Sequence, residues 1–231
     1  GYAWIGTSNG LNRFNQQTNR VVRFNNDPRN PNSLGSNDIL SITEDQGGYL
    51  WIGTTNGLDR FDRVTSTFTH FRRDTQNEGS ISSNYIYVVY VDSQNQVWVG
   101  TTAGLDRLDR ATGQFIHYTP RKDDPTSISG TLVYSIHEDS AGKLWVGTFE
   151  SGLNRFDPET GLFTRYRHDP QDKTSLNNDS IMTIYEDSKD RLWFGTDGGG
   201  LSLYHPETDS FTYYLEKDGL PNGVVYGILE D

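Results

Sequence analysis

The chain alternates short apolar runs with polar and glycine-containing turns. Residues 36–45, 49–54, 58–62 and 67–71 are such runs, rich in β-branched and aromatic side chains and separated by Gly, Asn, Arg, Thr and Ser. This pattern is typical of consecutive strands joined by hairpins. No segment has a helical periodicity long enough to predict a helix. We therefore expect four antiparallel strands in this part of the chain.

The same four-strand unit recurs along the whole sequence. Its marker is a Trp-x-Gly-Thr strand followed by Gly-Leu, and the five tryptophans stand 47, 47, 47 and 48 residues apart. They are Trp4, Trp51, Trp98, Trp145 and Trp193. A fixed period of this size is typical of a solenoid or a propeller, because one unit cannot bury its own apolar face and packs on its neighbours.

The period predicts an all-β fold: a five-bladed β-propeller of four-stranded antiparallel blades, in a single domain of residues 1–231. The last blade is expected to be composite, because the C-terminal 224–231 repeats a first-strand pattern whereas the chain begins at a second strand. Pairing of 222–231 with 2–7 would close the ring and remove its exposed sheet edges. The expected blades lie at about 34–72, 81–119, 128–167, 176–215, and 220–231 with 1–24.

The composition argues against several classes of function. The 231 residues include 20 basic and 31 acidic side chains, for a formal charge of −11. Such a chain lacks the basic surplus that displaces counterions from nucleic acid or binds an anionic membrane surface. No apolar run approaches the length of a membrane span, so we expect neither nucleic-acid binding nor direct membrane insertion. The absence of cysteine excludes disulfides and thiolate chemistry and fits an extracytoplasmic protein.

The repeat resembles the two-component regulator propeller repeat. The resemblance rests on Leu-Trp-Ile-Gly-Thr, Gly-Leu-x-Arg-Phe-Asp, a Pro-x-Thr-Gly turn, an aromatic fourth strand, Asp-Pro…Ser-Leu in the crossover loop and Ile-x-x-Ile-x-Glu-Asp in the next first strand. It implies a bacterial sensor domain, periplasmic or extracellular, ahead of a membrane span and a histidine kinase or diguanylate cyclase output. Known ligands in that family are often glycans. The family usually has more repeats, commonly two seven-bladed wheels, so the chain is either a small independent wheel or a piece of a longer sensor.

Several repeated side chains have both a structural and a functional interpretation. The tryptophans could stack on sugar rings, but an identical residue in every blade is what packing requires, and we expect inter-blade core. In pairs such as Glu44-Asp45 the two carboxylates point to opposite faces of a strand, so we expect the Asp to cap the following turn. One set of arginines is expected to lie on an apolar face and meet a neighbouring blade's carboxylate, with a ligand-binding ring as the alternative. These are Arg13, Arg60, Arg107 and Arg155.

No catalytic residue is predicted. The sequence contains no nucleophile–base pair, no His spacing typical of a zinc site and no pair of converging carboxylates. We therefore expect no enzyme, no cofactor and no metal site. A lyase is the enzyme alternative, because streptogramin lyases are propellers with related strands and use a His with a magnesium ion. No residue of this chain can be assigned to that role.

A binding site is expected where the repeat is broken. The second-to-third strand connections at 149–151 and 197–199 are each one residue longer than elsewhere. The starts of the first strands also vary, and all these loops open on one face of a propeller, where variation does not disturb blade packing. A small polar or glycan-like ligand would stack on the aromatic residues and bind the charged ones through its hydroxyls. The predicted ligand-binding residues are Tyr85, Phe149, Glu150, Asp197, Arg73 and Asp38.

Ordinary divergence of the repeat explains the same changes. In that case we expect a protein-interaction platform without a small ligand, whose partner is a second copy of the chain or another propeller. Both interpretations stay open at the level of the sequence.

Overall fold

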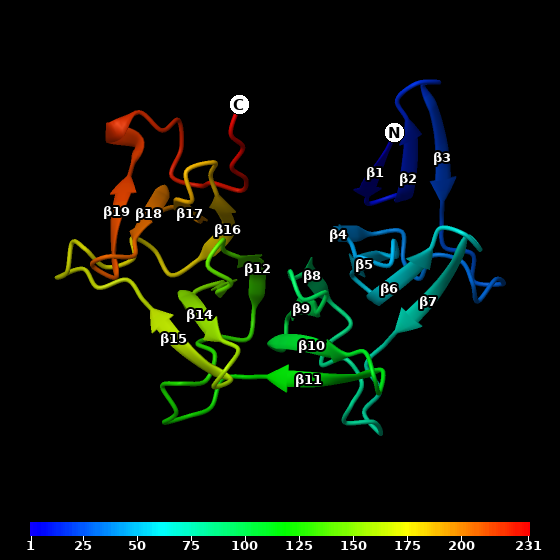
Figure 1. Cartoon of the computed structure of the whole chain (residues 1–231), viewed down its shortest axis with the longest axis horizontal. Helices are drawn as coiled ribbons and strands as arrows, with labels where there is room; N and C mark the ends of the chain where they lie inside the picture. Colours follow the sequence, from blue (N-terminus) through cyan, green and yellow to red (C-terminus); the bar gives the residue numbers. More distant parts are fainter. The chain divides into compact units, whose positions relative to one another are not determined.

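The computed structural model describes residues 1–231 as an all-β chain. It contains nineteen strands and one 3-10 turn, η1 (Glu216–Asp218), and no helix long and apolar enough to cross a membrane. The chain divides into two compact units, residues 1–117 and 118–231, each made of consecutive strand repeats (Figure 1). The all-β fold predicted from the repeat is confirmed.

The first unit contains three sheets whose strands follow one another in chain order and pair antiparallel. Their strands are β1 (Tyr2–Thr7), β2 (Gly10–Asn15) and β3 (Arg20–Phe24); β4 (Ile39–Glu44), β5 (Leu50–Thr54), β6 (Gly57–Asp62) and β7 (Thr67–Phe71); and β8 (Ile86–Val91), β9 (Val97–Thr101), β10 (Leu105–Asp109) and β11 (Gln114–Tyr118), which ends at the first residue of the second unit.

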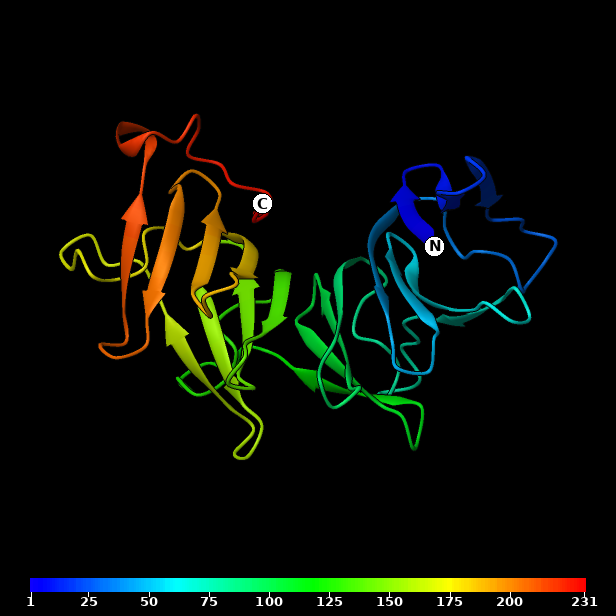
Figure 2. The same ribbon diagram turned by 45° about the horizontal axis from the view of Figure 1, so that its top comes forward.

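The second unit contains two four-stranded sheets of the same design, and Figure 2 shows the strands of the last one, in gold to orange, lying side by side. Their strands are β12 (Val133–Glu138), β13 (Leu144–Thr148), β14 (Leu153–Asp157) and β15 (Leu162–Tyr166), then β16 (Ile181–Glu186), β17 (Leu192–Thr196), β18 (Leu201–His205) and β19 (Ser210–Tyr214).

The first sheet has three strands, whereas the sequence predicted a fourth from residues 222–231. Those residues contain no strand: Val224 forms an isolated bridge with Asp197, and the N–H of Val225 donates to Thr196 O at 2.9 Å. The segment therefore begins against β17 of its own unit, but a strand needs a ladder of hydrogen bonds over several residues. The composite blade and the closure of the ring stay predictions.

Adjacent sheets of each unit pack through an aromatic and aliphatic layer. In the first unit the Trp4 ring lies 5.5 Å from that of Phe61 on the next sheet, and in the second the Trp145 ring lies 5.5 Å from that of Phe194. Trp51 and Trp145 are each 1% exposed. These tryptophans therefore form inter-sheet core, as predicted, and are unavailable to stack on a sugar.

The glycine of Trp-x-Gly-Thr allows neighbouring sheets to approach. A Cβ at Gly53 would lie 2.8 Å from the Ile86 side chain, and one at Gly147 would lie 2.7 Å from the Ile181 side chain. Both isoleucines begin the first strand of the following sheet. The motif is thus conserved within the chain by packing, because a methyl group at this point would push the sheets apart.

Candidate functional site

The loop between β13 and β14 places Phe149 against an aromatic neighbour. Its N–H donates to Leu132 O at 2.9 Å, and its ring stacks on Tyr134 of β12 with the centroids 5.5 Å apart and the planes inclined by 30°. Both rings are half-buried. Phe149 therefore packs on its own sheet, and part of its surface stays accessible to solvent.

Ser180, which directly precedes β16, joins the two lengthened loops. Its hydroxyl accepts a hydrogen bond from the N–H of Glu150 at 3.1 Å, and its carbonyl accepts one from the N–H of Asp197 at 3.0 Å. Glu150 is exposed and Asp197 half-buried. The structure thus brings Phe149, Glu150 and Asp197, all predicted from the sequence, to neighbouring positions around the start of one strand.

Glu150 has a strained backbone. Its φ is +57°, in the left-handed region, whereas the other lengthened loop has Gly198 with a φ of +94°. A residue with a Cβ costs about 1–3 kcal/mol in such a conformation, and strain of this kind is concentrated at functional sites. Glu150 therefore has a carboxylate where the backbone favours glycine.

The other three predicted residues lie in the first unit. Asp38 and Tyr85 directly precede the equivalent first strands β4 and β8, and the Tyr85 ring lies 4.8 Å from that of Tyr87. The N–H of Arg73 donates to the Asn84 side chain at 2.8 Å, so Arg73 and Tyr85 lie at the two ends of one crossover loop. Arg73 and Tyr85 are exposed, and Asp38 is half-buried. Asp38, Arg73 and Tyr85 thus belong to the first unit, whereas Phe149, Glu150 and Asp197 belong to the second.

Tyr134 and Tyr87 were not predicted from the sequence, and Ser180 was expected only as one of the varying starts of the first strands. Tyr134 and Tyr87 are 47 residues apart, at the same position of successive first strands, and each pairs with an aromatic residue of the predicted site. The signal was available as an aromatic residue that recurs beside a variable one. The two tyrosines belong to the regular part of the repeat, whereas the site was predicted from the breaks in it.

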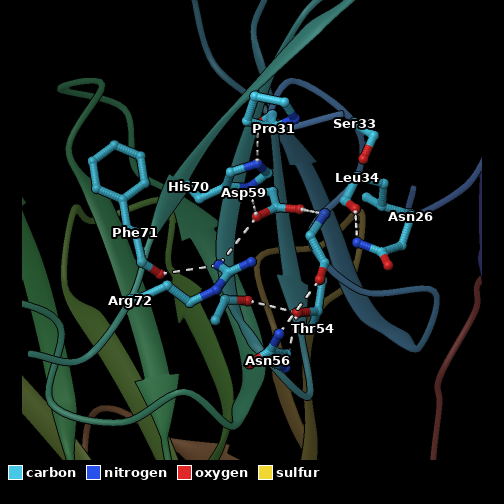
Figure 3. A network of polar contacts seen from close by, with 12 residues as sticks. Asn26, Pro31, Ser33, Leu34, Thr54, Asn56, Asp59, His70, Phe71 and Arg72 are labelled. Carbon is cyan, nitrogen blue, oxygen red and sulfur yellow. Dashed lines mark hydrogen bonds and ion pairs between the residues drawn. The ribbon is translucent and has the colours of Figure 1, made fainter. Parts of the chain in front are cut away.

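A second polar cluster holds the crossover loop before β4 (Figure 3). Asp59 on β6 is fully buried; its carboxylate accepts from the N–H of Gly35 at 2.6 Å, His70 Nδ1 at 2.7 Å and Arg72 at 3.2 Å. His70 Nε2 lies 2.9 Å from Pro31 O. Since both ring nitrogens face acceptors, only the protonated imidazole can donate to both. The Asp59 hydrogen bond raises the pKa of His70 above its usual value, against the effect of burial.

The cluster recurs in altered form on other sheets. His117 Nδ1 lies 2.6 Å from buried Asp106 and its Nε2 lies 2.9 Å from Glu78 O, and the Asp106 hydrogen bond raises the pKa of His117. In the second unit Arg165 takes this position and donates to Ser127 O at 2.7 Å and Asp124 O at 2.8 Å. The loops of the first unit are thus held by titratable cations and this loop of the second unit by a permanent one.

The repeated acidic residues have the predicted structural role. Asp45 accepts from the N–H groups of Gly47 and Tyr49 at 3.0 Å each, and in addition from Trp51 Nε1 at 2.9 Å. Burial would raise the pKa of Asp45, but the hydrogen bonds from Trp51, Arg110 and Tyr49 together keep it below its usual value. The carboxylate therefore fixes the turn, as predicted, and in addition holds the tryptophan, a contact that was not predicted from the sequence.

The repeated arginines lie over aromatic rings. The guanidinium carbon of Arg60 is 4.8 Å from the Tyr49 ring centroid, and that of Arg155 is 5.5 Å from the Trp145 ring centroid. Arg155 also lies 3.7 Å from Asp209 of the next sheet, the carboxylate contact expected from the sequence. Cation–π contact with core aromatics supports the structural interpretation of these residues.

Comparison with known proteins identifies the repeats. Four segments, residues 33–56, 80–103, 127–150 and 175–198, match the two-component regulator propeller. The sheets are therefore propeller blades. The chain thus carries repeats of the two-component regulator propeller family. No curated protein sequence matches it.

Solved structures with the same fold include extracellular domains of two-component and one-component systems. An extracellular domain assigned to a hybrid two-component system of B. thetaiotaomicron is 25% identical with a TM-score of 0.78, over 92% of this chain and 28% of that one. An extracellular domain assigned to a one-component system of the same organism is 27% identical with a TM-score of 0.69, over 92% of this chain and 26% of that one. The chain therefore spans little more than a quarter of each.

An enzyme shares the architecture. Virginiamycin B lyase from Staphylococcus aureus is 17% identical with a TM-score of 0.65, over 93% of this chain and 66% of that one. At this identity the likeness shows the fold alone.

Proposed function

We propose that the chain is a ligand-sensing propeller domain that binds a small polar or glycan-like ligand. The observation that carries the proposal is the arrangement around Ser180: the stacked Tyr134–Phe149 pair, with Glu150 and Asp197 fixed to the start of the adjacent first strand. An aromatic surface beside solvent-accessible carboxylates suits a ring with hydroxyl groups on its edges.

The aromatic pair and the carboxylates match the two kinds of surface that a sugar presents. A sugar ring has an apolar face that stacks on an aromatic ring, and its hydroxyls donate to carboxylate oxygens, which accept only. Charge-assisted hydrogen bonds of this type are stronger than those between neutral groups. Glu150 is also held in a backbone conformation that costs free energy, which supports a selected role for its side chain.

The signalling context follows from the family. The similar domains of B. thetaiotaomicron are extracellular parts of hybrid two-component and one-component systems. By this likeness the chain would lie outside the cytoplasmic membrane, periplasmic or extracellular, and report ligand binding to a linked histidine kinase or diguanylate cyclase. The site is one of binding and not of catalysis, since its groups have roles in stacking and hydrogen bonding.

A protein-interaction platform is the second candidate. The outer face of the first sheet exposes Ile5 by 47% and Val21 by 57%, around a hollow of ≈ 360 Å³. The equivalent residues of the next sheet, Ile52 and Phe68, are buried in the core shared with the first sheet. A second copy of the chain or another propeller could cover the Ile5 face in the same way.

A ligand screen separates the two candidates. The purified domain is exposed to a glycan array and to polar metabolites in a thermal-shift assay. A ligand at about 100 times its Kd should stabilise the fold by ~2.7 kcal/mol, which corresponds to a rise in Tm of about 5–10 °C. If both screens are negative while light scattering shows a dimer, the sensor proposal fails and the platform takes its place.

A further inference from the structure

The sheets of the second unit enclose a hollow at the ends of the strands opposite to the Ser180 site. It has a volume of ≈ 450 Å³ and lies between the β12–β15 and β16–β19 sheets. Asp139, in the turn after β12, lines it together with Glu186, Tyr204 and Pro206. Nothing in the sensor proposal uses this place.

The first unit shows what fills the equivalent place there. Arg110, which directly follows β10, reaches the previous sheet, where its Nη2 donates to Asp45 Oδ2 at 3.0 Å. Its guanidinium carbon lies 5.7 Å from the Trp51 ring centroid. The Asp45 side chain is fully buried beneath it. Asp45 thus binds two partners at one oxygen, the Trp51 indole and a guanidinium from the next blade.

The second unit has the equivalent carboxylate but no arginine in the place of Arg110. Asp139 is equivalent to Asp45 and accepts from Trp145 Nε1 at 2.7 Å, as Asp45 does from Trp51. The residue that directly follows β18, in the place of Arg110, is Pro206. The proline side chain is uncharged and too short to contact Asp139 as Arg110 contacts Asp45. Asp139 is half-buried and lines the hollow. The hollow therefore corresponds to the position that the Arg110 guanidinium occupies between the β4–β7 and β8–β11 sheets.

The charge of the hollow favours a cation. Its carboxylates outnumber its cations, and Arg191 is already engaged, with its Nε 2.6 Å from Asp187 Oδ2 and its guanidinium 5.3 Å from the Trp193 ring centroid. Unlike charges attract more strongly in a partly desolvated hollow than in water, and the chain's charge of −11 adds a favourable field. The charged lining residues are Asp139, Glu186, Asp190 and Glu207 against Lys189 and Arg191.

We propose that this hollow is a binding site for a small organic cation with a guanidinium head. The head would donate to Asp139 Oδ2, as Arg110 donates to Asp45, and the aliphatic part would lie toward Leu192 and Leu203 in the lining. The site is distinct from the Ser180 site in position and in ligand class, so either can exist without the other.

Calorimetric titration with agmatine tests the proposal, with butylurea as the uncharged control that lacks both cationic groups of agmatine. Agmatine should bind the wild-type domain with a stoichiometry of one, and butylurea should not bind measurably. Pro206→Arg, which restores the repeat's own arginine, should weaken agmatine binding at least tenfold. Pro206→Ala is the matched control and should keep the affinity within about threefold.

The reciprocal variant is Arg110→Ala, which opens the equivalent place beside Asp45. It should bind agmatine with a stoichiometry near two, and circular dichroism would verify that each variant is folded. The proposal is overturned if wild type shows no saturable agmatine binding, if Pro206→Arg binds as wild type does, or if the stoichiometry of folded Arg110→Ala stays at one.

Discussion

The Phe149 ring stacks on the Tyr134 ring at a centroid distance of 5.5 Å, although Phe149 lies in the loop after β13 and Tyr134 lies on β12 of the same sheet. Stacked pairs of this kind add about 0.5–1.5 kcal/mol beyond area burial. Phe149→Ala should therefore lower the Tm by only a few °C, while weakening ligand binding at least tenfold. Thermal denaturation and titration of the variant with a ligand from the screen check both effects.

Trp145→Ala is the contrasting change. Trp145 is 1% exposed and contacts Phe194 and Tyr204 of the next sheet. Removing it should cost about 3–5 kcal/mol because it leaves a cavity and frees the Asp139 carboxylate from its indole partner. Urea denaturation measures this loss; a cost below about 1 kcal/mol would contradict an inter-sheet core role for the tryptophans.

Glu150→Gly separates stability from function. Glycine adopts the φ of +57° without strain, so the variant should be more stable than wild type by up to about 1 kcal/mol. It also lacks the carboxylate and should bind the ligand more weakly. Glu150→Gln keeps the strain and removes only the charge, which makes it the matched control. If Glu150→Gly bound as tightly as wild type, Glu150 would have no part in the site.

His70 and His117 predict a loss of stability on the alkaline side. Their pKa values are raised in the folded protein, so their contribution is complete below the unfolded pKa of about 6.5 and is lost as the pH rises through the folded values. The Tm should fall by about 3–8 °C between about pH 6 and pH 8.5.

The double variant His70→Arg with His117→Arg should flatten this dependence, since Arg165 holds the equivalent loop with a permanent charge. His205→Arg is the control, because His205 is bonded to Thr212 and not to a buried carboxylate. A double variant with the wild-type pH dependence would show that the two histidines do not hold the loops.

Gly147→Ala tests the spacing between sheets. The added methyl would lie 2.7 Å from the Ile181 side chain and would also clash with Ser135 Oγ, and strands hold both residues in place. Overpacking of this kind costs roughly 1–3 kcal/mol. Gly142→Ala is not a suitable comparison because its φ is +74°, whereas Ala141→Gly in the same turn leaves the sheet contact intact. Chemical denaturation of both variants should show a loss for Gly147→Ala that exceeds that of the control.

Most of the fold could be predicted because the residues that repeat along the sequence are those that pack between the sheets. Trp51 and Gly53 recur in every repeat, and the position of Ile86 is always β-branched, as Ile39, Val133 and Ile181. Each of these positions has a role in bringing one sheet against the next. Whether residues 222–231 form a strand could not be predicted in the same way. Val224 and Val225 have the pattern of a strand, but strand formation depends on a partner edge that a pattern does not contain.

The candidate site was predicted in part for a similar reason. Phe149, Glu150 and Asp197 depart from the repeat and so are visible in the sequence, whereas Tyr134 and Ser180 are joined to them by contacts that the repeat pattern does not specify. The role of His70 was hidden because its partners are a carboxylate on the neighbouring strand and a carbonyl 39 residues away.

The most direct test of the sensor proposal is the affinity of one ligand, found in the screen, for three proteins: wild type, Phe149→Ala and the control Val64→Ala. Val64 is 94% exposed and lies in the turn between β6 and β7 of the first unit. We predict a saturable titration for wild type and Val64→Ala with equal Kd, and at least a tenfold higher Kd for folded Phe149→Ala. Equal affinity of all three proteins would contradict the placement of the site around Tyr134, Phe149 and Ser180, and with it the proposed function.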